Sequence, residues 1–370
     1  MNAVCTIVNQ SYLPQALVQH ESLKATNPNS EHYILITDGV PVNLEILCQA
    51  ELLEISDLGI TQQKLEKMLS YYDEVEFATA MKPSLLKLLL FRGYSSVTFI
   101  DPDTLVLGHL GLAQDLAVLH GVVLTPHRLS PAHSSTKFSI STEINFLRYG
   151  VYNLGFISVG QDGLGMLDWW ETRLEMYCSR KSSLPIFTDQ KWIDLVPSYF
   201  NHYILKSPSY NLAYWNIDER VLTSNGGSYL VNNEPLVFIH FSQMSSRLAK
   251  GLGTPLWEMA LSEDSSESLE IISEITDHYV NRLKFFKKLL VENQVEMSLN
   301  QSKFSGVESG RYGQRFRMIS AEINLGGWKS LIDRFLSSKF VKNLERSEAF
   351  VGVIDGIIAD YKRLSKKLKR

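Results

Sequence analysis

Short runs of apolar, β-branched and aromatic residues alternate with helical patterns along the first two-thirds of this sequence. Each run is apolar throughout, as strands buried on both faces of a parallel sheet are. The strand candidates are Val4–Val8, Tyr33–Thr37, Val97–Ile100, Val122–Thr125, Phe156–Val159 and Leu236–His240. Helical patterns such as Pro14–Ala25 and Ser84–Phe91 lie between them. The alternation predicts an α/β fold whose ligand site lies at the carboxyl ends of the strands.

The pattern changes near residues 251–255, beyond which the sequence is almost entirely helical in character. Thr254-Pro255 is typical of a helix start, because proline is favoured at the first helical position. Apolar residues then step by three and four, which predicts helices with one apolar face. They are Ile272, Ile275, Tyr279, Leu283, Phe286 and Leu290, and later Val353, Ile357, Tyr361, Leu364 and Leu368. We expect one domain over residues 1–253 and a helical C-terminal extension over residues 254–370.

Charge and cysteine usage restrict the partners and the compartment. The net charge is −4, so no overall basic field attracts a nucleic acid polymer, and we expect none as a partner. Cys5, Cys48 and Cys178 are far apart and form no C-x-x-C pair, which predicts buried free thiols rather than disulfides or a zinc site. The N-terminus lacks a signal-peptide pattern, and no apolar run is long enough to cross a bilayer. We therefore expect a cytoplasmic protein.

The most informative motif is the segment Val97–Leu107, in which an apolar strand runs directly into Asp101-Pro102-Asp103. Proline ends the strand, and positions i and i+2 of an extended chain point the same way. Two carboxylates are thus presented together at a strand end, as Mn²⁺ or Mg²⁺ ligands shared with substrate phosphates often are. The alternative is a solvated turn with a helix-capping aspartate.

This segment and five others resemble, in order, the GT-A-fold glycosyltransferases of the family 8 type. The resemblance covers about the first 250 residues, and the ordered set is more specific than any single motif. The motifs are Ala80-Met-Lys82-Pro83 before the helix ending at Phe91, Asp101-Pro-Asp103, Asn153-Leu-Gly155, Thr188-Asp189-Gln190, Asn211 to Asn216, and Phe238-Ile-His240-Phe-Ser242. It implies a mixed sheet of GT-A type flanked by helices, with the helical region at the C-terminus.

The resemblance also implies roles for individual residues. His240 would join Asp101 and Asp103 as the third metal ligand, Asn153 and Gly155 would border the sugar pocket, and Asp189 and Gln190 would act beside the transferred sugar. Residue by residue there are plain alternatives. A histidine that ends a strand is often only packed, Asn153 and Gly155 can simply close a turn, and Asp189 can cap the helix that Gln190 begins.

The nucleotide of the donor would lie on the first two strands. The resemblance places backbone groups of Thr6, Val8 and Asn9 and the ring of Tyr12 against the uracil, and Asp38 near the nucleoside. Lys82 would reach the diphosphate or the sugar. The family usually has a glycine and a lysine downstream of the late histidine, where this chain has Gln243 and Ser246. Arg247 and Lys250 are the nearby cations that could contact the phosphates instead.

These observations predict a metal-dependent glycosyltransferase that uses a nucleotide-sugar donor, most simply a UDP-sugar, with retention of configuration. The acceptor, whether protein, glycan or lipid-linked, cannot be read from the sequence. Two alternatives stay open: a haloacid-dehalogenase-type phosphatase with Asp101 as nucleophile, and a degenerate transferase domain that serves as a binding module. The stretch 361–370 combines basic residues with an apolar stripe, which allows peripheral contact with an anionic membrane.

Overall fold

The computed structural model describes residues 1–131, 140–180, 185–242, 257 and 266–295. The strands are β1 (Asn2–Val8), β2 (Glu31–Ile36), β3 (Glu51–Glu54), β4 (Ser96–Ile100), β5 (Thr104–Val106), β6 (Val122–Pro126), β7 (Tyr152–Gly160), β8 (Tyr203–Ile204), β9 (Leu222–Asn225), β10 (Ser228–Val231), β11 (Glu234–Pro235) and β12 (Phe238–His240). The helices are α1 (Leu13–Thr26), α2 (Gln62–Tyr71), α3 (Glu74–Ala80), α4 (Lys82–Phe91), α5 (Gly111–His120), α6 (Ile140–Tyr149), α7 (Leu164–Leu174), α8 (Gln190–Ile193), α9 (Val196–Tyr199) and α12 (Ser266–Glu292).

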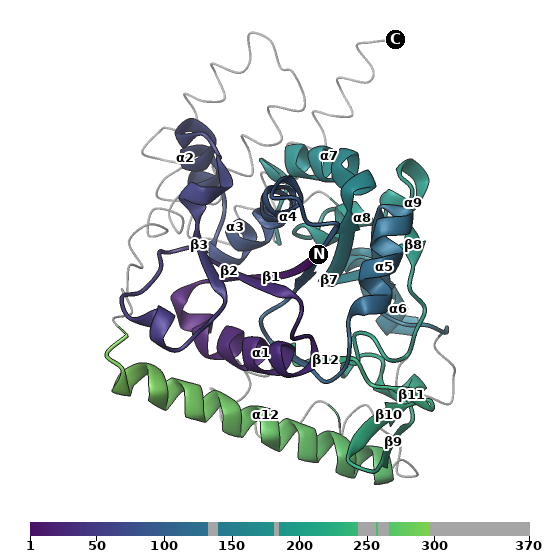
Figure 1. Cartoon of the computed structure of the whole chain (residues 1–370). Coiled ribbons are helices and arrows are strands. Elements are labelled where there is room, and N and C mark those ends of the chain that lie inside the picture. The colour runs from purple at the N-terminus through teal and green to yellow at the C-terminus, as the bar shows by residue number, and fades with distance from the viewer. Residues whose placement is uncertain (132–139, 181–184, 243–256, 258–265, 296–370) are drawn as a thin grey trace, which may run out of the picture.

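Seven strands form the central sheet in the order β3-β2-β1-β4-β7-β6-β8 (Figure 1). The pairs β2–β3, β1–β2, β1–β4 and β6–β8 are parallel, whereas β7 is antiparallel to both of its neighbours, β4 and β6. The amino end of β7 therefore lies beside the carboxyl end of β4. The register pairs Ile100 with Phe156, and the amide of Asp101 donates to the carbonyl of Gly155 at 2.8 Å.

A second, two-stranded sheet pairs β5 with β12 in antiparallel fashion. Thr104 lies opposite His240 in this register, and the amide of Phe241 donates to the carbonyl of Asp103 at 2.7 Å. A late segment of the chain is thereby fixed against the turn that follows β4. The strands β9, β10 and β11 form a separate three-stranded sheet.

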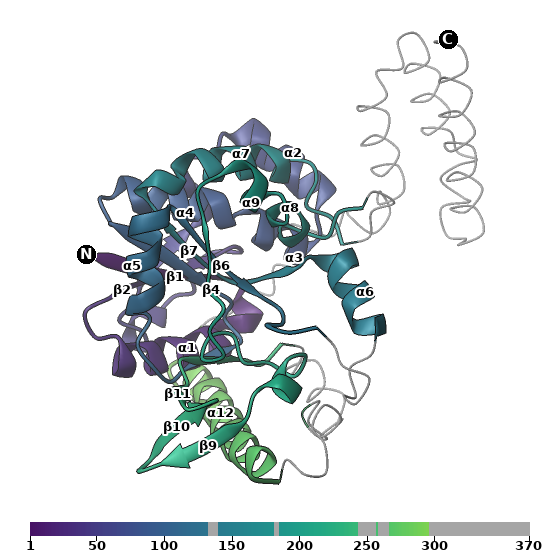
Figure 2. The same ribbon diagram turned by 90° about the vertical axis from the view of Figure 1, so that its right-hand side faces the viewer.

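Helices cover both faces of the central sheet, because the apolar side chains of its strands alternate between the two faces. Ala3, Cys5 and Ile7 of β1 belong to a core cluster with residues of α2, α3, α4 and α7. Val4 and Val8 point the other way, into clusters formed with α1, α5 and α12. Figure 2, turned from the first view, shows these two layers of helices on either side of the strands.

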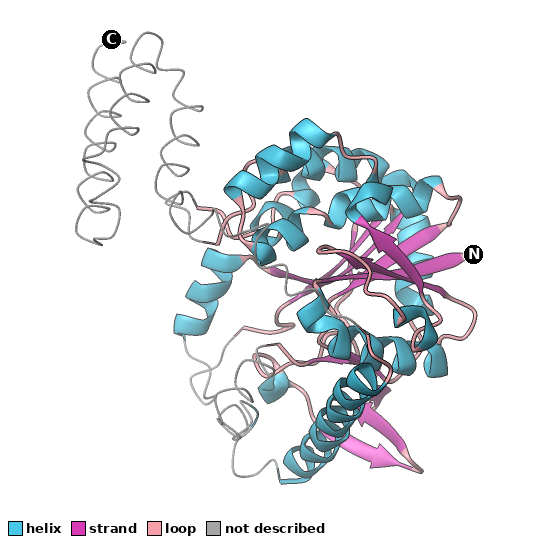
Figure 3. Cartoon of the chain, turned by 90° about the vertical axis from the view of Figure 1, so that its left-hand side faces the viewer, coloured by secondary structure: helices cyan, strands magenta, loops and turns pink. Residues whose placement is uncertain are grey.

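The long helix α12 packs along α1 and beside β9 (Figure 3). Its buried side chains include the whole stripe expected from the sequence, Ile272, Ile275, Tyr279, Leu283, Phe286 and Leu290. The ring of Tyr279 stacks on Phe241 with centroids 4.1 Å apart, directly after β12. This part of the expected C-terminal extension thus shares a core with the sheet domain.

The predicted α/β fold, a mixed sheet flanked by helices, is confirmed, and each strand predicted from the sequence is present. Cys5, Cys48 and Cys178 are buried and free, as expected. The boundary between residues 253 and 254 stays a prediction. The helix start at Thr254-Pro255 and the apolar stripe from Val353 to Leu368 lie outside the described residues. Among the helices that the structure describes, none is long and apolar enough to cross a membrane.

Candidate active site

A cavity of about 820 Å³ opens at the carboxyl ends of β1 and β4 and the amino end of β7. Nine of the residues singled out from the sequence line it. They are Tyr12, Lys82, Asp101, Asp103, Asn153, Gly155, Asp189, Gln190 and His240. The reversed strand β7 and the β5–β12 pairing explain how residues so far apart in the chain meet, since each brings a strand end to the same place.

Asp101, Asp103 and His240 form a cluster in which each residue offers one metal-ligand atom, and these atoms lie within 4.8 Å of one another. His240 Nε2 lies 3.1 Å from Asp103 Oδ1 and 3.8 Å from Asp101 Oδ2. Gln19 of α1 fixes the turn that carries the aspartates. Its Nε2 donates to the carbonyl of Asp101 at 2.6 Å and to Thr104 Oγ1 at 2.7 Å. Two carboxylates and one imidazole fit a hard divalent cation such as Mn²⁺ or Mg²⁺.

Gly155 leaves the room that the imidazole of His240 occupies. A Cβ at position 155 would lie 2.4 Å from His240 Cε1 and 2.8 Å from its Nδ1, closer than van der Waals contact allows. The imidazole thus packs directly against the backbone of β7, with its Nε2 facing the carboxylates. Trp215 packs edge-on against the imidazole, with 5.4 Å between the ring centroids. Burial lowers the pKa of His240, and the carboxylates of Asp103 and Asp101 raise it to a value above the ordinary one.

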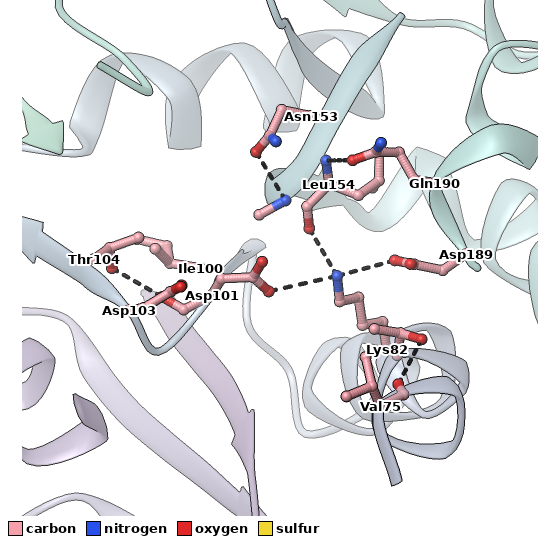
Figure 4. Close-up of polar contacts among 12 residues, drawn as sticks. Val75, Lys82, Ile100, Asp101, Asp103, Thr104, Asn153, Leu154, Asp189 and Gln190 are labelled. Carbon is pink, nitrogen blue, oxygen red and sulfur yellow. Dashed lines mark hydrogen bonds and ion pairs between the residues drawn. The ribbon is translucent and has the colours of Figure 1, made fainter. Parts of the chain in front are cut away.

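Lys82 connects the metal-ligand cluster to Asp189 (Figure 4). Its Nζ lies 2.9 Å from Asp189 Oδ2 and 3.6 Å from Asp101 Oδ1, and it donates to the carbonyl of Leu154 at 2.8 Å. The lysine is buried, and its ammonium also lies 4.5 Å over the ring of Phe99. Burial lowers the pKa of Lys82, but Asp101 and Asp189 outweigh it and leave the pKa raised, so the ammonium is charged.

Asp189 does not cap the helix that follows it. Its backbone is helical, its side chain makes no capping hydrogen bond, and the carboxylate is buried against Lys82. The capping alternative is therefore wrong. The preceding residue, Thr188, has a φ of 46°, a left-handed conformation that costs a β-branched residue about 1–3 kcal/mol. Strained backbone of this kind gathers at functional sites.

Both polar atoms of the Gln190 side chain form hydrogen bonds with backbone groups. Its Oε1 accepts from the amide of Leu154 and its Nε2 donates to the carbonyl of Tyr149, both at 3.0 Å. These bonds tie α8 to the start of β7 and the end of α6. The side chain lines the cavity, and it fixes the backbone segment that carries Asn153 and Gly155.

Asn153 orients the first residues of β7 and meets a histidine that the sequence reasoning missed. Its Oδ1 accepts from the amide of Gly155 at 3.0 Å, and its Nδ2 lies 3.3 Å from His127 Nε2. His127 Nδ1 lies 3.1 Å from the carbonyl of Val151, so the ring donates from Nδ1 and accepts at Nε2. Burial lowers the pKa of His127 to about 4, which keeps this arrangement neutral.

Four donor-binding candidates are placed near the cavity but do not line it. Thr6 and Val8 are buried in β1, and the carbonyl of Val8 accepts from the amide of Thr37 at 2.8 Å. Asn9 donates to Glu74 Oε2, and Asp38 accepts from the amide of Gln10 at 2.9 Å. Arg247 and Lys250 lie outside the described residues. The nucleotide-binding roles of all six stay predictions.

The cavity contains further residues that sequence reasoning did not select. Arg180 contributes a guanidinium, which pairs with Asp73 at 2.6 Å at the start of α3. Several aromatic side chains come from α6 and from the segments around residues 187 and 215. The Asn211–Asn216 motif pointed to two of them, Tyr214 and Trp215. The rings of α6 were missed because they lie in a helix with no strand-end signal.

Comparison with known proteins finds no protein-family model that matches this chain. The uncharacterized protein YfnD of Bacillus subtilis (strain 168) is 24% identical over 254 residues, which cover 64% of this chain and 76% of that protein.

Among solved structures, the chain is similar to the galactosyltransferase LgtC in complex with donor and acceptor sugar analogs, at 12% identity and a TM-score of 0.42, covering 71% of this chain and 98% of that one. It is also similar to mouse xyloside xylosyltransferase 1, at 10% identity and a TM-score of 0.37, covering 58% and 88%. Similarity at this level assigns no function to the chain.

Proposed function

We propose that this protein is a metal-dependent glycosyltransferase of the GT-A type, which transfers a sugar from a nucleotide-sugar donor, most simply a UDP-sugar. The observation that carries the proposal is the convergence of Asp101, Asp103 and His240 in a cavity that also contains Lys82 and Asp189. The order of motifs in the sequence, which resembles family 8, supports the same class.

The proposed metal ligands are Asp101, Asp103 and His240, and the ion would be Mn²⁺ or Mg²⁺. Such an ion, when bound, neutralises the charge that develops on a leaving nucleoside diphosphate. Gly155 and the β5–β12 pairing hold the imidazole, and Gln19 holds the aspartate turn. The chain thus fixes all three ligands through contacts that do not depend on substrate.

Lys82 and Asp189 would set the electrostatics of the sugar pocket. The ammonium lies between two carboxylates, so it keeps Asp101 oriented toward His240 and holds the side chain of Asp189 beside the pocket. In the proposal, Asp189 faces the transferred sugar on the side opposite the leaving group, as expected for transfer with retention. Gln190 would contribute by fixing Leu154 and its neighbours at the pocket edge.

The donor's base would lie against Tyr12, whose side chain is 40% exposed at the cavity. Its nucleoside would approach the ends of β1 and β2, where Thr6, Val8, Asn9 and Asp38 are found, and Arg247 and Lys250 are proposed phosphate contacts. We further propose a cytoplasmic location. Peripheral membrane contact through the basic stretch 361–370 remains part of the proposal and lies outside the described residues.

A panel of nucleotide sugars tests the proposal against its alternatives. The transferase releases nucleoside diphosphate from at least one donor only with Mn²⁺ or Mg²⁺, and NMR of the released or transferred sugar reports its anomeric configuration. A phosphatase with Asp101 as nucleophile instead hydrolyses p-nitrophenyl phosphate. A degenerate binding module shifts its melting temperature with a donor and turns over neither substrate.

A further inference from the structure

One helix face lines the cavity with neutral side chains. Thr142, Asn145, Phe146 and Tyr149 of α6 follow the spacing i, i+3, i+4, i+7, so they share one side of the helix, and all four line the cavity. Ile144 and Leu147 are more than half exposed and do not line it. Figure 2 shows α6 at the edge of the described part of the chain, beside the carboxyl ends of the strands.

Phe187 and Trp215 continue this face toward the proposed metal site. The ring of Tyr149 lies 4.6 Å from that of Phe187, and the ring of Phe146 stacks on His127 at 5.0 Å. His127 in turn meets Trp215, which contacts His240. We call Thr142, Asn145, Phe146, Tyr149, Phe187 and Trp215 the aromatic wall. It extends from the backbone that Gln190 holds to the imidazole of His240.

We infer that the aromatic wall is the acceptor subsite and that it binds a neutral saccharide. The term acceptor rests on the proposed function, and the binding chemistry rests on the wall itself. A pyranose has apolar C–H faces that pack on aromatic rings, and it has hydroxyl groups that need a few well-placed polar partners. Phe146 and Tyr149 supply the rings, and Asn145 and Thr142 supply an amide and a hydroxyl.

The absence of charge on the wall selects against other acceptors. None of its six residues is of an acidic or basic type. The cations that line the same cavity, Arg180 and Lys82, are paired with Asp73 and with Asp189, so a phosphate or carboxylate group at the wall meets only cations that already have a carboxylate partner. The charged residues of α6, Glu143 and Arg148, do not line the cavity, and Arg148 places its guanidinium 5.2 Å over the Tyr149 ring. A peptide or a phospholipid headgroup therefore matches this wall less well than a neutral glycan does.

The test is binding of the full chain to an array of neutral, sialylated and sulfated oligosaccharides, without donor or metal. Wild type binds neutral glycans, and Asn145→Ala and Phe146→Ala each weaken binding by about tenfold or more. Leu147→Ala, on the exposed side of the same helix, is the matched control and binds as wild type does. Because Asn145 is exposed, its variant folds even if the Phe146 variant is less stable.

The outcomes for the subsite and for the proposed function are separable. No glycan binding, binding only of charged glycans, or binding by both Asn145→Ala and Phe146→Ala at wild-type strength overturns the subsite. If wild type then still hydrolyses a nucleotide sugar, the proposed function stands without it. The Asp103→Asn variant, which lacks a proposed metal ligand, keeps its glycan binding. Glycan binding by a chain that hydrolyses no donor overturns the proposed function and retains the subsite.

Discussion

Lys82 and Asp189 form a buried ion pair, 2.9 Å between Nζ and Oδ2, that joins the start of α4 to the residue before α8. Removing one partner of a buried pair leaves an uncompensated charge and costs about 3–5 kcal/mol. We expect Lys82→Met to lower the free energy of unfolding by that amount and to abolish transfer. Asp189→Asn keeps the side-chain shape and lowers transfer more than donor affinity. Urea unfolding and donor titration measure these effects.

The matched control for Lys82 is Lys87 on the same helix. It pairs with Asp168 and Glu171 nearer the surface, where such pairs contribute about 1 kcal/mol or less. Lys87→Met leaves transfer intact. Equal losses for the two lysine variants, in stability and in activity, contradict a special role for the Lys82 pair.

Gly155→Ala tests whether the close contact between position 155 and the imidazole of His240 fixes this metal ligand. The added Cβ would meet His240 Cε1 at 2.4 Å, so the imidazole must leave the position in which its Nε2 faces the two aspartates. We expect Mn²⁺ affinity and transfer to fall at least about tenfold, the range seen when a contact that orients a metal ligand is lost, while circular dichroism stays unchanged.

Gly165→Ala is the control for that glycine substitution, because a Cβ there meets nothing within 4 Å. Gly165 lies in α7, where alanine in place of glycine stabilises a helix by about 0.5–1 kcal/mol. If Gly155→Ala binds Mn²⁺ as tightly as wild type does, the contact between residue 155 and His240 does not position the metal ligand.

A buried histidine pair makes stability depend on pH. His20 Nδ1 lies 2.8 Å from His32 Nδ1, so one nitrogen donates, the other accepts, and both rings are neutral. Burial is the main cause that lowers the pKa of His20 to about 4 and the pKa of His32 well below its ordinary value. The neighbouring charge of Lys24 lowers both values, and Glu21 raises that of His20.

Because histidines of the unfolded chain titrate near 6.5, that state binds more protons below this pH. The contribution of the pair is complete above about pH 7. It falls as the pH drops toward 4, by up to about 1.4 kcal/mol per pH unit for each histidine. Urea unfolding at pH 7.5 and 5.0 measures the loss. His20→Leu/His32→Leu reduces the slope without removing it, since His127 acts in the same direction. An unchanged slope in the double variant contradicts this explanation.

Ile275 tests whether α12 belongs to the cooperative unit of the sheet domain. Its side chain is buried in the cluster shared with α1, so Ile275→Ala costs about 2–5 kcal/mol and lowers the melting temperature of the whole domain. Val291, 76% exposed on the same helix, is the control, and Val291→Ala changes little. A separate transition for α12, with the main transition unmoved, contradicts a shared core.

The sequence was sufficient for the strands and for much of the site, because buried strands and Asp101-Pro-Asp103 have local signatures. It did not reveal that β7 runs against its neighbours, since a strand buried on both faces reads the same in either direction. Nor did it show the roles of Gln19, His127 and the rings of α6. These residues act through contacts distant in sequence, and glutamine, histidine and phenylalanine within helical or loop segments are common for many other reasons.

The central claim is that Asp101, Asp103 and His240 hold a divalent ion for sugar transfer. The most direct measurement is the rate at which nucleoside diphosphate is released from a panel of UDP-sugars with Mn²⁺, for wild type and Asp103→Asn. We expect release from at least one donor, its loss in EDTA, and a rate at least about a hundredfold lower in Asp103→Asn, because a carboxamide carries no charge for the ion. Equal rates in EDTA, equal rates in the variant, or no release from any donor would contradict the account.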